Sequence, residues 1–218
     1  MTPIVSIVGT SKSGKTTLLE KLIPELKSRG YRVATVKHTP DQVTLDEPGK
    51  DSWRHIQAGS EATIISTSDQ VTLVKPVAAD TTLEEIVRLF GEDHDIILAE
   101  GFKQDGGPKI EVHRKEVGPP LTDVKHLVAI VTDEPLDTKV RQFPLEDIAV
   151  LADFLEKGFI KPQRERVVLY VNDNAIPLST FPRDFIASVL MAMASCLRGV
   201  GTIKSLKVFL KRNNSGEG

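Results

Sequence analysis

The sequence predicts an α/β fold with a mostly parallel β-sheet flanked by helices, followed by a small α+β unit. Residues 4–8, Ile-Val-Ser-Ile-Val, form a run that is apolar apart from one serine, which is typical of a strand buried on both faces. Residues 15–29 carry leucine and isoleucine at helical spacing, and residues 32–36 predict a second strand. A helix between two strands gives a crossover long enough for parallel pairing. The chain therefore opens as a β-α-β unit.

The same two periodicities predict the remaining elements of the first domain, residues 1–158. Strands are predicted at residues 62–66, 70–74, 96–99, 109–113 and 127–131, and helices at residues 52–58, 83–90 and 145–155. The strands at 62–66 and 70–74 are close enough to pair as an antiparallel hairpin. Thr82 and Glu85 match a capping box at the start of the helix at 83–90.

A second domain is predicted at residues 159–218. Residues 157–166 are charged and contain glycine and proline, as expected of a linker. Beyond them we expect a ββαβ module, with strands at 167–171 and 175–178, a helix at 184–197 and a strand at 206–210. The apolar stripe of that helix, and Cys196 within it, are more typical of a buried core than of a ligand site.

The composition excludes several classes of protein. The 218 residues include 28 Lys and Arg against 30 Asp and Glu, which argues against binding nucleic acid over the whole surface. A single cysteine excludes an internal disulfide and a multi-cysteine metal site. No apolar stretch approaches the roughly 20 residues that span a bilayer, and the first residues lack the features of a signal peptide. We expect a soluble, cytoplasmic protein with neither a nucleic-acid nor a membrane partner.

Residues 9–16, Gly-Thr-Ser-Lys-Ser-Gly-Lys-Thr, match the phosphate-loop pattern G-x-x-x-x-G-K-[ST]. They lie between a predicted buried strand and a predicted helix, which is the context that this motif requires. Backbone N–H groups of such a loop and the positive end of the helix bind phosphates. A Gly- and Ser-rich turn without a ligand is the alternative. The residues expected to bind a nucleotide are Gly9, Thr10, Ser11, Lys12, Ser13, Gly14, Lys15, Thr16 and Thr17. The expected fold is therefore that of a P-loop NTPase.

The motif also predicts a metal site. Lys15 would bridge the terminal phosphates, and the hydroxyl oxygen of Thr16 would bind Mg²⁺. Ligands gather at the carboxyl ends of parallel strands, where Glu100 follows its apolar run while Asp95 precedes it. We therefore predict Lys15 and Glu100 as catalytic residues, and Thr16 and Glu100 as metal ligands. For Glu100, a solvated charge at a strand end is the alternative.

Three further residues are candidates for nucleotide binding. Asp133 follows the strand at 127–131, where a carboxylate could accept the N–H groups of guanine, although the usual Asn-Lys-x-Asp sequence is absent. A turn aspartate fits equally well. Lys50 and Asp51 precede the helix at 52–58, where free backbone N–H groups are exposed. A capped, solvated loop is the alternative there.

Several segments together resemble the MobB family of molybdopterin-guanine dinucleotide biosynthesis adaptor proteins. These are the phosphate loop, Val36-Lys37-His38, residues 46–59, Leu98-Ala-Glu-Gly-Phe-Lys103 and Pro108-Lys-Ile-Glu-Val112. The resemblance covers residues 3–156. It implies a homodimeric GTP-binding protein with weak intrinsic GTPase activity that assists a MobA-like molybdopterin guanylyltransferase. GTP and Mg²⁺ are the implied ligands, with molybdopterin as a ligand that the protein could carry.

Two other functions fit the same loop. A stand-alone small-molecule kinase would use Lys50, Asp51 and Arg54 at its acceptor site. A metallochaperone-type GTPase would use His38 as a metal ligand, although Thr39-Pro40-Asp41 follows it where family members often carry more histidines.

Overall fold

The computed structural model describes residues 2–39, 46–77, 81–91, 93–163, 167, 169–172, 174–203, 206–208 and 210. Tertiary contacts divide the chain into two compact units, residues 2–164 and 165–218. The boundary that the sequence predicts, after Gly158, falls inside a π-helical turn at Glu156–Ile160. None of the helices within the described residues is long and apolar enough to cross a membrane.

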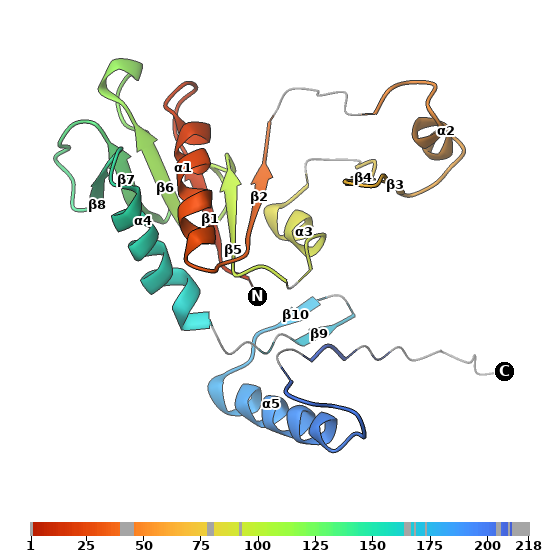
Figure 1. Ribbon diagram of the computed structural model, residues 1–218. Coiled ribbons are helices and arrows are strands. Elements are labelled where there is room, and N and C mark those ends of the chain that lie inside the picture. The colour runs from red at the N-terminus through yellow and green to blue at the C-terminus, as the bar shows by residue number, and fades with distance from the viewer. Residues whose placement is uncertain are drawn as a thin grey trace. The chain divides into compact units, whose positions relative to one another are not determined.

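A six-stranded sheet forms the centre of the first unit, in the order β2-β5-β1-β6-β7-β8 (Figure 1). Its strands are β1 (Ile4–Val8), β2 (Val33–Lys37), β5 (Ile96–Glu100), β6 (Lys109–His113), β7 (Leu127–Thr132) and β8 (Arg141–Pro144). All neighbouring strands in this sheet are parallel, which confirms the predicted α/β class. The sequence patterns do not predict β8, an edge strand in which only Phe143 is buried and which ends in a proline.

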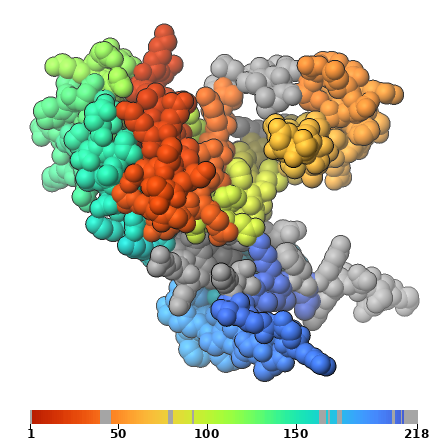
Figure 2. Space-filling model, viewed as in Figure 1, coloured from red at the N-terminus to blue at the C-terminus, as the bar shows by residue number. Residues whose placement is uncertain are grey.

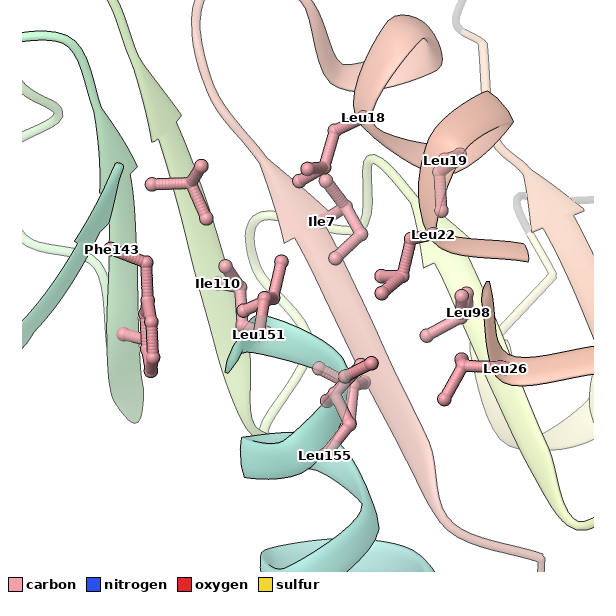
Figure 3. Close-up of a cluster of buried hydrophobic side chains, with 14 of the residues drawn as sticks. Ile7, Leu18, Leu19, Leu22, Leu26, Leu98, Ile110, Phe143, Leu151 and Leu155 are labelled. Carbon is pink, nitrogen blue, oxygen red and sulfur yellow. The ribbon is translucent and has the colours of Figure 1, made fainter. Parts of the chain in front are cut away.

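Helices cover both faces of this sheet. Helices α1 (Lys15–Ser28) and α4 (Ile148–Leu155) cover one face, and Figure 3 shows Leu22, Leu26, Leu151 and Leu155 pointing toward the strands. Helix α3 (Leu83–Arg88), which begins with the predicted capping box, packs on β2 and β5 from the other side. Along β5, alternate side chains enter the two cores. This burial on both faces explains why the first four residues of the strand, Ile96 to Ala99, are all apolar.

Charged side chains join α1 to α4, which lie side by side (Figure 2). Nη1 of Arg29 donates to Asp153 Oδ1 at 2.6 Å and to Glu156 Oε2 at 3.0 Å. Helix α4 begins later than the predicted residue 145, because β8 continues to Pro144 and the carboxylate of Asp147 accepts a hydrogen bond at the helix start. The two helices are therefore held together over the same face of the sheet.

Residues 51–74 form a separate small element. Helix α2 (Asp51–Gln57) precedes strands β3 (Thr63–Ser66) and β4 (Val71–Val74), which pair antiparallel as predicted. Ile64 is paired with Leu73, and these two side chains are 65% and 41% exposed. Val71 lies on the same face and is 67% exposed. One face of this hairpin therefore presents apolar side chains to solvent.

The second unit contains β9 (Leu169–Val171), β10 (Asn174–Ile176) and α5 (Thr180–Ser195). The antiparallel hairpin is confirmed. The strand predicted at 206–210 is wrong for the described residues 206–208 and 210, because an apolar segment forms a strand only where a neighbouring strand supplies hydrogen bonds. The predictions of a buried Cys196 and a buried α5 stripe are also wrong, since Cys196 is exposed and α5 buries none of its side chains. Helical spacing predicts an apolar face but not what covers it.

Candidate functional site

The predicted phosphate loop connects β1 to α1 at the carboxyl end of a central strand. Gly14 adopts a left-handed conformation as the N-cap of α1, with φ of 96°. A Cβ atom on Gly9 would lie 2.5 Å from the Val112 carbonyl oxygen and 2.5 Å from Ser13 Oγ. Position 9 therefore requires glycine because the loop packs directly against the end of β6.

The side chain of Lys15 lies over this loop. Its Nζ donates to the carbonyl oxygens of Thr10 at 2.7 Å and Gly9 at 3.3 Å. Burial lowers the pKa of Lys15, and the positive charges of Lys103 and Lys37 lower it further, whereas the carboxylate of Glu100 raises it. The ammonium group is thus held by two neutral carbonyl oxygens, which an anionic phosphate oxygen could replace.

Thr16 and Glu100, the two predicted metal ligands, lie together. The Thr16 hydroxyl is 3.1 Å from both carboxylate oxygens of Glu100. Glu100 ends β5, the direct neighbour of β1, whereas Asp95 at the opposite end accepts a hydrogen bond from the Arg32 amide. A hydroxyl and a carboxylate suit Mg²⁺, which takes its other oxygen ligands from water and phosphate. The donor set therefore fits the predicted ion.

A cavity of about 220 Å³ lies beside this pair, between α1 and β2. Thr16, Glu100 and Lys37 line it together with apolar side chains of α1. Lys37 Nζ is 3.8 Å from Glu100 Oε1. The side of the loop that faces β5 therefore has an open cavity that is lined by a positively charged and a negatively charged side chain, Lys37 and Glu100.

On the other side of β1, Asp133 follows β7. Its Oδ1 accepts a hydrogen bond of 2.9 Å from the amide of Lys115, the first residue of the short 3₁₀ helix Lys115–Val117. Nearby, Glu134 contacts Nε2 of the buried His113 at 3.0 Å. Asp133 therefore braces the segment after β6, and its contact with guanine remains a prediction.

Lys50 and Asp51 make their ion pairs within their own segment. Lys50 Nζ is 3.6 Å from Glu47, and Asp51 is 3.5 Å from Arg54. The structure does not bring either residue into contact with the phosphate loop, so their binding role remains a prediction.

His38 packs against the ring of Phe102, with ring centroids 4.9 Å apart. Across the described part of the chain, no group of three or more His, Cys, Asp and Glu side chains is arranged to hold a metal ion. A metallochaperone site of that kind is therefore not formed by these residues.

Arg114 is a residue of this site that the sequence analysis did not identify. It follows β6, and a Cβ atom on Gly14 would lie 3.4 Å from its Nε and 3.5 Å from its Nη2. The guanidinium therefore lies against the phosphate loop. This contact is hard to predict from sequence, because Arg114 reaches the loop only when β6 is the neighbour of β1 in the sheet.

Comparisons with known proteins agree on one family. Residues 4–133 match the family model of MobB, molybdopterin guanine dinucleotide synthesis protein B. The molybdopterin-guanine dinucleotide biosynthesis adapter protein of Haemophilus influenzae is 40% identical over 159 residues, covering 71% of this chain and 88% of that protein. The adapter protein of Escherichia coli is 35% identical over 161 residues, covering 71% and 92%. A putative adapter protein of Methanocaldococcus jannaschii is 26% identical over 231 residues and covers 94% of this chain and 96% of its own, so that similarity extends into the second unit.

Solved structures show the same fold. A crystal structure of molybdopterin-guanine biosynthesis protein B matches with a TM-score of 0.56 at 31% identity, covering 71% of this chain and 97% of that one. A MobB homologue from Bacillus stearothermophilus matches with a TM-score of 0.54 at 26% identity, covering 71% and 95%. These matches confirm the predicted P-loop α/β architecture.

Proposed function

This chain belongs to the MobB family, and on that premise we propose that it is a GTP-binding adapter protein in the synthesis of the molybdopterin guanine dinucleotide. The observation that supports nucleotide binding most directly is the convergence of Thr16 and Glu100 at 3.1 Å beside the phosphate loop. A metal ion placed there would meet the phosphates of a nucleotide held by the loop.

We propose that GTP binding displaces Lys15 from the carbonyl oxygens of Gly9 and Thr10 and turns its ammonium group toward the terminal phosphates. Mg²⁺ would then be held by Thr16 and Glu100, with phosphate and water oxygens completing its shell. Fast hydrolysis needs a group that orients the attacking water. Because the nearby carboxylate, Glu100, already contacts Thr16 and would face the metal, we expect slow GTP turnover by the protein alone.

The proposed partners follow from the family. We propose that a MobA-like guanylyltransferase, which attaches GMP to molybdopterin in the cytoplasm, is the protein assisted, with molybdopterin as a ligand that the adapter could carry. We also propose that the protein is a homodimer. The exposed apolar face of β3 and β4, with Ile64 65% and Val71 67% exposed, supports this, because such a face is stabilised when a second copy covers it.

Isothermal titration calorimetry with GTP and ATP, each with Mg²⁺, tests nucleotide binding. We expect the wild-type protein to prefer GTP, and Lys15→Ala to weaken GTP binding by about 100-fold or more, since charged hydrogen bonds are worth about 1.5–3 kcal/mol each. Lys21→Ala is the matched control, because Lys21 lies on the same helix but pairs with Glu146 at 3.1 Å. Unchanged GTP affinity in Lys15→Ala, with an unchanged circular dichroism spectrum, would contradict the proposed site.

Steady-state turnover separates an adapter from an enzyme. Without a partner, we expect GTP hydrolysis far slower than the roughly 1–100 s⁻¹ of kinases. A rate in that range, or a phosphorylated small-molecule product, would favour a kinase instead.

A further inference from the structure

The two sides of the phosphate loop carry different side chains, and this difference determines which end of a bound nucleotide lies on which side. Thr16 and Glu100 meet on the side of β1 where β5 lies, and β6 and β7 lie on the other side. If Thr16 and Glu100 hold Mg²⁺, the terminal phosphates that such an ion would contact belong on the β5 side. The α-phosphate and the nucleoside then extend toward the ends of β6 and β7. This orientation rests on the proposed function.

Arg114 lies on the nucleoside side with an unsatisfied donor. Its Nε is buried and has no hydrogen-bond partner among the described residues. Its ion pair with the exposed Glu116 is loose, with Nη1 3.6 Å from a carboxylate oxygen. A buried donor without an acceptor costs free energy unless a ligand supplies one.

The position of the guanidinium also brings two positive groups together. Gly14 caps the first turn of α1, where the helix dipole leaves partial positive charge. The guanidinium lies beside this cap, within 3.4 Å of the position that a Cβ of Gly14 would take. Two positive groups at this distance repel each other, and an anion that contacts both of them would offset the repulsion. A phosphate oxygen would remove the repulsion and accept the free N–H.

The backbone around Arg114 is fixed from both sides. The carbonyl of Val112 abuts Gly9 of the loop, and the amide of Lys115 donates to Asp133 at 2.9 Å. The Arg114 carbonyl accepts from the amide of Val117 at 3.0 Å. The guanidinium is thus carried on a pre-organised segment, which lowers the entropic cost of binding.

We propose that Arg114 is a nucleotide-binding residue that donates from its guanidinium to the α-phosphate of the bound guanine nucleotide. This contact adds a side chain from the segment that follows β6 to a site otherwise formed by the loop, α1 and β5. It also gives Asp133 a positioning role, because Asp133 holds the segment that carries Arg114.

Calorimetric titration of Arg114→Ala with GTP, GDP and inorganic tripolyphosphate tests this assignment. We expect all three to bind more weakly by a similar factor, about 10- to 100-fold, as the loss of a charged hydrogen bond implies. Arg114→Lys should recover part of the affinity, because it keeps the charge but loses the planar donor set. Arg32→Ala is the control, since Arg32 pairs with Asp95 away from the loop and should leave all three affinities unchanged. The midpoint of thermal unfolding of unliganded Arg114→Ala should not fall below that of the wild type, because the substitution removes a buried donor without an acceptor and its repulsion with the start of α1.

The other outcomes separate the ways in which this assignment can fail. Unchanged affinities in Arg114→Ala would overturn it. Weaker binding of GTP but not of GDP would place Arg114 at the terminal phosphate. Weaker binding of both nucleotides but not of tripolyphosphate would place it at the base. Either result would overturn the α-phosphate contact. A wild-type protein that binds none of the three ligands would overturn the proposed function itself, and this inference with it.

Discussion

Substitution of Gly9 by alanine tests the closest contact in the phosphate loop. Alanine would have to adopt φ of +153° and place its Cβ 2.5 Å from the carbonyl oxygen of Val112 and 2.5 Å from Ser13 Oγ. The unfavourable backbone conformation costs about 1–3 kcal/mol. The Ser13 hydroxyl can rotate away, but the carbonyl belongs to β6 and moves only with the strand. Forced overlap in a packed region adds about 1–3 kcal/mol. We therefore expect Gly9→Ala to lower the free energy of unfolding by about 2–6 kcal/mol.

Gly118→Ala is the matched control for the backbone term. Gly118 has φ of +133°, and a Cβ there would meet no atom within 4 Å. Equilibrium urea denaturation followed by far-ultraviolet circular dichroism gives the free energy of unfolding of both variants and the wild type. Gly9→Ala should be less stable than Gly118→Ala by about 1–3 kcal/mol, which is the overlap term alone. Equal stability of the two variants would refute the argument that β6 and the loop approach too closely for a side chain.

Acidification and a charge in the β3–β4 hairpin provide two further tests. Hydrogen bonds from Lys161 and then Arg29 lower the pKa of Glu156 from 4.5 to about 2, so the stability that they contribute is present above pH 4.5 and is lost as the pH falls toward 2. The midpoint of thermal unfolding should fall over this range, and Glu156→Gln should make the fall shallower; an identical pH profile would contradict this role. Ile64→Glu should shift the proposed homodimer to monomer in sedimentation equilibrium, while Gln70→Glu, at the exposed turn of the same hairpin, should leave it dimeric. A dimeric Ile64→Glu would exclude this face as the dimer contact.

Local patterns were enough to predict much of the first unit. The apolar run of β1, the leucine spacing of α1 and the loop motif between them are each contained in a few adjacent residues, and the structure forms all three at the predicted places. Glu100 was found by the rule that ligands gather at the carboxyl ends of strands, and it contacts Thr16. Such features depend on hydrogen bonds and side-chain directions within one element, so short segments encode them.

Local sequence patterns gave wrong predictions for segments whose structure depends on the strands beside them in the sheet. β8 has only one buried apolar side chain, Phe143, and exists because it pairs with β7. Residues 206–208 and 210 show the converse, since they are mostly apolar and yet form no strand in this structure. Hydrogen bonds to an adjacent strand, which no short window contains, decide both cases.

The motif spacing in this chain therefore specified a phosphate loop and a carboxylate to face it, because both are local consequences of backbone geometry. Strand order decided which other side chains reach that loop. Ser6 of β1 is paired with Ala99 on one side and with Lys109 on the other, residues about a hundred positions away in the chain. Only this long-range pairing brings Arg114 against Gly14 and separates the metal side of the site from the side that we assign to the nucleoside.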